Sequence, residues 1–116
     1  MPTTPGTSLS THVLDTERGQ PAVGVPVTLS RSADGALVLV ACGETDGDGR
    51  INHLGETLQE GTYQLAFDLA AYQRRHGREA PFLQRVVVEF RAVADGRHHH
   101  VPLLLSSYSG TIYRGS

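Results

Sequence analysis

Apolar and polar residues alternate along most of this chain, and that period predicts β-strands. Residues 23–29 place Val or Leu at every second position between small or polar residues, as in a half-buried strand. Residues 63–67 repeat the alternation with Tyr, Leu and Phe. Pro26 interrupts the first run and favours an edge position or a bulge. The continuous apolar run at 37–42 predicts a short buried strand.

Other segments complete an all-β pattern with one exception. Residues 68–77 contain good helix formers, begin with an acidic residue and end with glycine, which predicts a single short helix. Further strands are expected at 9–15, 50–52, 85–91, 101–105 and 111–113. About eight short strands separated by turn residues predict an antiparallel β-sandwich.

Composition places the chain among ordinary globular proteins. Its 116 residues suit one domain, 1–116, with residues 1–7 expected to be flexible, and 39% of residues are apolar. The net charge of −2 and the lack of a long basic run argue against nucleic-acid or anionic-membrane partners. The first residues do not resemble a secretory signal, and the apolar runs are too short to span a membrane. We therefore expect a cytoplasmic protein.

Metal and thiol sites find weak support in the sequence. Cys42 has no second cysteine to pair with, and its apolar surroundings predict a buried, inert thiol. An acidic turn partly matches a calcium loop, but Gly55 occupies the last position, where glutamate is required. His98 and His100 share a strand face and could bind zinc with His12, but this spacing is not specific. We predict no metal and no cofactor.

Two residues and the end of the chain are the remaining candidates for chemistry. His12 alternates with Thr11 and Val13, so it faces the opposite side of its strand. Considered alone, His12 is expected to be a surface histidine, and Arg50 is expected to be a solvated hairpin arginine. The final four residues, Tyr-Arg-Gly-Ser, are unusual choices for a dispensable tail.

Four motifs together resemble the 5-hydroxyisourate hydrolase family, the transthyretin-related enzymes of urate breakdown. They are LSTHVLD at 9–15, Gly49-Arg50, HHHVPLLL at 98–105 and YRGS at 113–116. Their order and the position of the last motif make the resemblance specific, and it covers nearly the whole chain. Residues 106–112 depart from the family pattern, which usually has a proline and Tyr-Gly-Tyr there.

The resemblance implies a fold, an assembly and a reaction. The fold would be two four-stranded sheets with one short helix. The assembly would be a homotetramer, a dimer of dimers, with active sites in the channel where dimers meet. The reaction would be hydrolytic ring opening of 5-hydroxyisourate to 2-oxo-4-hydroxy-4-carboxy-5-ureidoimidazoline, on the route from urate to allantoin. The catalytic residues would be His12, Arg50, His100 and Ser116, and the substrate would contact His12, Arg50, Tyr113, Arg114, Gly115 and Ser116.

The residue types suit this chemistry without a metal. A neutral histidine can take the proton of an attacking water near neutral pH, and we leave open whether His12 or His100 does so. The Arg50 guanidinium would bind a carbonyl oxygen and stabilise the charge that develops on it. Tyr113 would anchor the end of the chain by burying its ring. Gly115 would let the backbone approach the substrate, and the Ser116 hydroxyl or carboxylate would position water.

Two alternatives share the predicted fold. Transthyretin, a thyroid-hormone carrier, is built on the same sandwich, so the fold does not decide the function. The set His12, Arg50, His100 and Tyr-Arg-Gly-Ser fits the hydrolase and not the carrier. An adhesion-type sandwich would leave this set unexplained. His99, at a position that is often aromatic in the family, should face away from the catalytic side.

Overall fold

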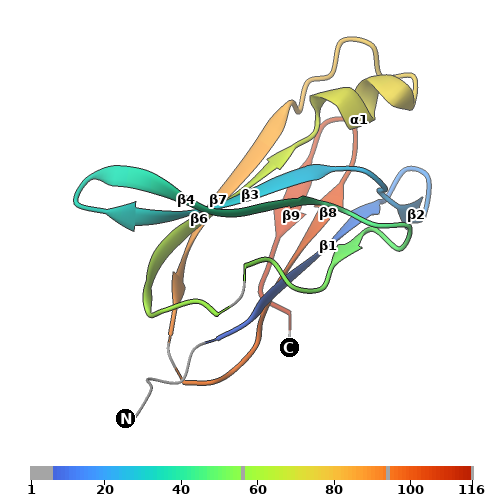
Figure 1. The fold of residues 1–116 in the computed structure, drawn as a ribbon. Helices are drawn as coiled ribbons and strands as arrows, with labels where there is room; N and C mark the ends of the chain where they lie inside the picture. Colours follow the sequence, from blue (N-terminus) through green and yellow to red (C-terminus); the bar gives the residue numbers. More distant parts are fainter. Residues whose placement is uncertain (1–6, 56, 94, 116) are drawn as a thin grey trace, which may run out of the picture.

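Two β-sheets pack face to face, with one short helix at one end of the sandwich (Figure 1). The structure is a computed structural model that describes residues 7–55, 57–93 and 95–115. Within these residues it contains nine strands, two of which have only two residues each. The predicted sandwich with a single helix is confirmed.

The first sheet carries most of the predicted site residues. Its order is β2-β1-β8-β9, and β5 also pairs with β1. Its strands are β1 (Leu9–Asp15), β2 (Gln20–Pro21), β5 (Arg50–Ile51), β8 (His99–Leu105) and β9 (Gly110–Ile112). β1 and β8 run parallel, which differs from the purely antiparallel expectation. These strands lie far apart in sequence, so no tight hairpin fixes their relative direction.

The second sheet is antiparallel throughout, in the order β4-β3-β6-β7. Its strands are β3 (Pro26–Ala33), β4 (Ala36–Glu44), β6 (Gly61–Asp68) and β7 (Arg85–Ala92). The facing sides of the two sheets bury one apolar core, to which β1, β3, β6 and β8 each contribute alternate residues. Its fully buried members include Val13, Val25, Leu29, Leu65, Phe67, Leu103 and Leu105. Burial of this apolar surface is the main stabilising contribution to the fold.

β3 differs from its prediction in position and extent. It begins at Pro26, and Val23 before it is exposed. β3 is a central strand, not an edge strand, and tolerates Pro26 because proline is its first residue. The bulge predicted at Pro26 does not occur, because Pro26 pairs in register with Glu44; the register of β3 against β4 shifts instead between Leu29 and Ser30.

β4 is exposed, and its prediction as a buried strand was wrong. Leu39 is 63% exposed, and neighbouring apolar residues of the strand are also open to solvent. β4 lies at the edge of its sheet, and the β3–β4 hairpin projects beyond the sandwich (Figure 1). Cys42 is an exposed free thiol, contrary to the buried thiol expected from its apolar neighbours. An apolar run alone does not distinguish a core strand from an edge strand.

The helix α1 (Ala70–Arg75) is shorter than its prediction. Asp68 is the last residue of β6 and pairs with Arg85, so it does not begin the helix. Gly77 follows the helix with a φ of 81°, the left-handed conformation typical of a glycine that ends a helix.

A buried carboxylate holds the helix region against the end of β1. Asp15 is fully buried and accepts hydrogen bonds from Arg78 at 3.0 Å and from the Tyr72 hydroxyl at 2.8 Å. Burial raises the pKa of Asp15, but the hydrogen bonds from Arg78 and Tyr72 outweigh burial, so its pKa lies below the usual value. The ionised carboxylate therefore stabilises the fold.

Arg78→Ala should lower the free energy of unfolding by on the order of 3 kcal/mol at neutral pH, because it leaves a buried carboxylate without its cation. The folded-state pKa of Asp15 is lowered, so its contribution is complete above about pH 4 and is lost as the pH falls through the folded-state pKa. Urea unfolding at a series of pH values should show the difference between wild type and variant shrinking below about pH 4. A difference that stays constant into strong acid would contradict this role.

Of residues 1–7, which were expected to be flexible, residues 1–6 lie outside the described residues. Thr7 is buried and pairs with Leu58. Among the described residues, no helix is both long enough and apolar enough to cross a bilayer.

Candidate active site

The outer face of the first sheet brings His12, Arg50 and His100 together. His12 pairs with Arg50 of β5 on one side and with Pro102 of β8 on the other. Directly paired residues of neighbouring strands lie on the same face, and alternate residues of one strand share that face. His12, Arg50, Pro102 and therefore His100 share a face, and the alternate residues of β1 and β8 point into the core. These three predicted residues thus lie on one face although they are up to 88 positions apart.

A tight turn before β5 sets the position of Arg50. The Asp46 carboxylate accepts the backbone N–H groups of Asp48 at 2.9 Å and Arg50 at 3.0 Å, and these bonds lower the pKa of Asp46. Gly49 has a φ of 73°, and a Cβ there would lie 2.6 Å from the Val13 carbonyl oxygen. Only glycine fits this approach, which places Arg50 beside His12. The acidic turn that partly matches a calcium loop therefore has a structural role, because it orients the backbone of Arg50.

His100 is half-buried and held from two sides. Its Nδ1 lies 2.7 Å from the Ser10 hydroxyl, and its carbonyl accepts the Gly115 N–H at 2.8 Å. Burial lowers the pKa of His100, and the positive charges of His98, Arg50 and His12 lower it further. A lowered pKa keeps the imidazole neutral at physiological pH, the form that can accept a proton.

The C-terminal segment lies along β8 next to His100. The N–H of Tyr113 donates to Pro102, and Gly115 forms a bridge with His100. Arg97, His98, Arg114 and Gly115 line a hollow of about 360 Å³. Tyr113 is 49% exposed in the single chain, so the prediction of a buried anchoring ring is not met there. Ser116, the fourth predicted catalytic residue, lies outside the described residues.

The structure adds two residues to this region that were not predicted as part of the site. Ser10 lies between two imidazoles, 2.6 Å from Nε2 of His98 and 2.7 Å from Nδ1 of His100. The alternation in β1 carried a signal for Ser10, because a residue two positions before His12 shares its face. His98 had been considered only as a metal ligand. Within the described part of the chain, no group of three or more His, Cys, Asp or Glu side chains could hold a metal ion.

His99 points away from the site, as predicted, but into the core. The Thr7 hydroxyl donates to the Arg97 carbonyl and lies 2.8 Å from His99 Nδ1. Its Nε2 is buried with no hydrogen-bond partner among the described residues. Burial, followed by the charge of Arg114, lowers the pKa of His99. His99 is therefore a neutral core residue.

We expect His99→Ala to cost about 1–3 kcal/mol of stability, because it removes buried volume and a hydrogen bond. His99→Phe should be nearly neutral, since it fills the space and removes the unpartnered nitrogen. Both variants should keep kcat/KM close to wild type once folded. Thermal unfolding of the pair checks this, and equal melting temperatures for His99→Ala and wild type would contradict the buried role.

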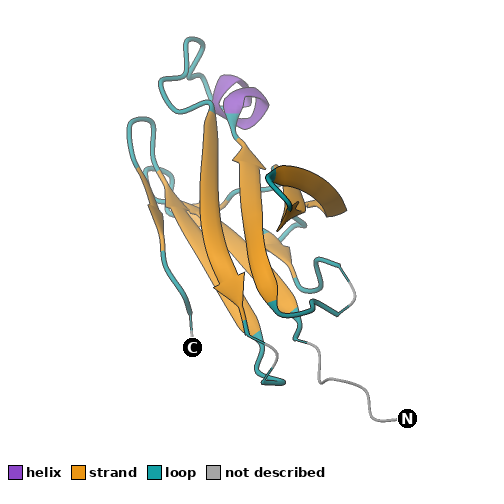
Figure 2. Ribbon diagram, turned by 90° about the vertical axis from the view of Figure 1, so that its left-hand side faces the viewer, coloured by secondary structure: helices purple, strands orange, loops and turns teal. Residues whose placement is uncertain are grey.

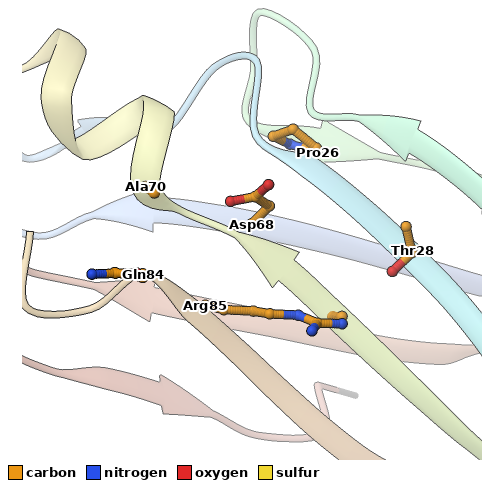
Figure 3. Close-up of a pocket in the computed structure, with 7 residues that line it drawn as sticks. Pro26, Thr28, Asp68, Ala70, Gln84 and Arg85 are labelled. Atoms are coloured by element: carbon orange, nitrogen blue, oxygen red, sulfur yellow. The ribbon is translucent and has the colours of Figure 1, made fainter.

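A second hollow, of about 390 Å³, lies on the other sheet near the start of α1 (Figure 3). Asp68 and Arg85, partners at the ends of β6 and β7, border it with Thr28 of β3. None of the sequence-predicted site residues lines it. The imidazoles of His12 and His100 and the guanidinium of Arg50 therefore lie on the first sheet, away from this hollow.

Comparisons with known proteins find similar proteins over most of this chain. A family model described as the HIUase/Transthyretin family matches residues 9–115. A 5-hydroxyisourate hydrolase of Pseudomonas aeruginosa is 41% identical over 114 residues, covering 93% of this chain and 90% of that protein. The solved 5-hydroxyisourate hydrolase of Klebsiella pneumoniae has a TM-score of 0.83 and 35% identity, covering 95% of this chain and 99% of that chain. Sea bream transthyretin in complex with thyroxine has a TM-score of 0.86 and 35% identity, covering 92% and 93% of the two chains.

Proposed function

This chain belongs to the HIUase/Transthyretin family, and from that membership we propose that it is a 5-hydroxyisourate hydrolase. It opens the ring of 5-hydroxyisourate with water to give 2-oxo-4-hydroxy-4-carboxy-5-ureidoimidazoline. One observation carries the proposal: His12, Arg50 and His100 share the outer face of the first sheet. Hydrolase relatives at about 40% identity support it further.

The proposed mechanism uses these three side chains and no metal. A neutral imidazole, of His12 or of His100, takes a proton from water as its oxygen bonds to a ring carbonyl carbon. Arg50 donates hydrogen bonds to the carbonyl oxygen, which becomes an oxyanion. The oxyanion then collapses, the ring C–N bond breaks, and the imidazolium returns its proton to the leaving nitrogen. The products are a carboxylic acid, which ionises, and an N–H group, so atoms and protons balance.

The C-terminal segment would complete the substrate pocket. Arg114 and Gly115 line the hollow beside His100, and Tyr113 lies next to them in sequence with its ring half open to solvent. We propose that these three residues contact the substrate together with His12 and Arg50. Ser116 keeps its proposed role as a water-positioning group, on the family resemblance alone.

A carrier for a small hormone-like ligand is the second candidate, because sea bream transthyretin shares the fold at similar identity. A carrier needs an apolar, complementary pocket, whereas this face offers a guanidinium and two imidazoles. The two candidates separate in one pair of measurements. We expect the protein to accelerate decay of freshly generated 5-hydroxyisourate, with and without chelator, and to bind thyroxine weakly or not at all by calorimetry. Tight thyroxine binding with decay at the spontaneous rate would favour the carrier.

We also propose that the active assembly is a dimer of dimers. Two edge strands lie on the same side of the sandwich, since a Cβ on Gly110 of β9 would lie 3.3 Å from Val86 of β7. Edges of this kind are covered by pairing between copies in many oligomers. Leu14 and Leu104 lie half-buried on the outer face with the candidate site and suit a second contact. The cytoplasmic location stays a prediction from the sequence.

We expect light scattering at micromolar concentration to report a tetramer. Burying the outer face in the assembly would also cover the half-exposed ring of Tyr113, which the single chain leaves open. A monomer with full hydrolase activity would contradict a site completed at the boundary between dimers.

A further inference from the structure

Four side chains form a continuous hydrogen-bonded chain at the start of β1 and β8. Ser8 Oγ lies 2.5 Å from Nδ1 of His98, whose Nε2 lies 2.6 Å from Ser10 Oγ. Ser10 Oγ lies 2.7 Å from Nδ1 of His100. Each link joins a hydroxyl to a ring nitrogen, so the hydroxyls and imidazoles alternate without a break. Such alternation allows protons to pass between the two histidines.

The two histidines of this hydrogen-bonded chain, His98 and His100, differ in their access to solvent. His100 is half-buried, packed under Gly115 and on the face that carries Arg50 and His12. His98 is exposed and lines the hollow that Arg97, Arg114 and Gly115 border. Ser10, which connects them, is buried. The chain therefore leads from the candidate site through a buried hydroxyl to the protein surface.

Hydrogen counting restricts the chain to two neutral arrangements. Ser10 has one hydroxyl hydrogen and can donate it to only one of its two imidazole neighbours. If it donates to His98, then His100 must hold its proton on Nδ1, which leaves Nε2 free to act as a base. If it donates to His100, then His98 supplies the hydrogen to Ser10, and His100 carries its proton on Nε2. The direction of the hydrogen bonds through Ser10 thus sets whether His100 acts as a base or as an acid.

We propose that His98, acting through Ser10, is the proton port of His100 in the hydrolysis, a proposal that rests on the proposed function. When His100 Nε2 takes a proton from water, its Nδ1 proton passes to Ser10 and the Ser10 proton passes to His98 Nε2. Along the relay the His100 Nδ1–H bond and the original Ser10 O–H bond break, and a new Ser10 O–H bond and a His98 Nε2–H bond form. The positive charge moves from His100 to His98. His98 is a positioning and relay residue, because it acts on the reaction through Ser10 and His100.

Electrostatics favours this transfer out of the site. A charged His100 would face Arg50 and His12 on the outer sheet face, in addition to a burial penalty. His98 lines one hollow with Arg97 and Arg114, and all three are exposed, so water and salt screen their charges. A charge on His98 is open to solvent, whereas a charge on His100 is half-buried. The arrangement leaves Arg50 free to stabilise an oxyanion without a neighbouring imidazolium competing for it.

The test compares a relay with a purely structural role for His98. His98→Ala should lower kcat on the order of tenfold in dilute buffer, less than the 10²–10⁴ range for a group in direct contact with the reaction. Added imidazole should restore most of the lost rate, because a small base can replace the missing proton carrier, and should leave wild type unchanged. A loss that imidazole does not alter, or no loss at all, would overturn the proposal.

Variants of the connecting hydroxyl provide the matched comparison. Ser10→Ala should reproduce the loss of His98→Ala, and Ser10→Thr should retain activity because it keeps the hydroxyl. His76→Gln serves as the control, since it removes a histidine at the helix end of the sandwich, opposite the C-terminal segment in both views (Figures 1 and 2). Equal kcat in Ser10→Ala and wild type would also overturn the relay.

A readout without substrate separates this proposal from the proposed function. Nitrogen NMR of the imidazoles should show coupled titration of His98 and His100 in wild type and independent titration in Ser10→Ala. If coupling is present but wild type does not hydrolyse 5-hydroxyisourate, the proposed function fails. Independent titration in wild type would overturn the relay whatever the activity.

Discussion

Arg50→Ala should lower kcat/KM for 5-hydroxyisourate by about 10²–10³, the usual effect of removing one donor to a developing oxyanion. Arg50 shares a sheet face with His12 and His100, and its backbone N–H donates a hydrogen bond to the Asp46 carboxylate, which fixes its position. Because the side chain is exposed, the melting temperature should change little. Steady-state kinetics and thermal unfolding of the same preparation check both statements.

Two variants control for the loss of positive charge. Arg50→Lys retains charge but not the planar pair of donors, so it should recover only part of the activity. Arg85→Ala removes an arginine from the hollow of the other sheet and should leave kcat/KM unchanged. An Arg85→Ala defect as large as that of Arg50→Ala would show that the site has been placed on the wrong sheet.

Gly115→Ala should reduce kcat/KM by on the order of 10²-fold while the fold is retained, since small displacements of a reacting group are costly. A Cβ at this position would lie 2.6 Å from Cδ2 of His100. Either the imidazole or the segment that carries Gly115 must then move, and movement of the imidazole would break its 2.7 Å contact with Ser10. The effect therefore acts through the orientation of His100, and we expect kcat to fall more than KM rises.

Gly43→Ala is the matched control for the added methyl group. A Cβ on Gly43 would make ordinary contact with Ile51 at 3.5 Å, so this variant should behave as wild type. If Gly115→Ala kept full activity, the close approach of the C-terminal segment to His100 would have no role in catalysis.

The sequence predicted the parts of this fold that depend on local periodicity. β1 and β6 lie where alternation placed them, and His12 and His99 face the predicted sides of their strands. Burial was harder to predict, because the apolar run of β4 lies at a sheet edge and the position of a strand in its sheet depends on long-range pairing. The parallel pairing of β1 with β8 is another such long-range feature.

The candidate site was predicted from motif resemblance more than from spacing. Nothing local in the sequence relates His12 to Arg50 or His100, which meet only through β1, β5 and β8. Ser10 was missed because a serine between two histidines becomes visible only when the strands pair. The ring of Tyr113 is half-exposed in the single chain, and its predicted burial would require the proposed assembly.

The most direct measurement follows the ultraviolet absorbance of freshly generated 5-hydroxyisourate with wild type, with Arg50→Ala, and with buffer alone, all in the presence of chelator. We expect rapid decay with wild type and decay within a small factor of the buffer rate with the folded variant. Decay at the buffer rate with wild type would contradict the hydrolase assignment. Equal acceleration by wild type and Arg50→Ala would contradict the placement of the reaction on the face shared by His12, Arg50 and His100.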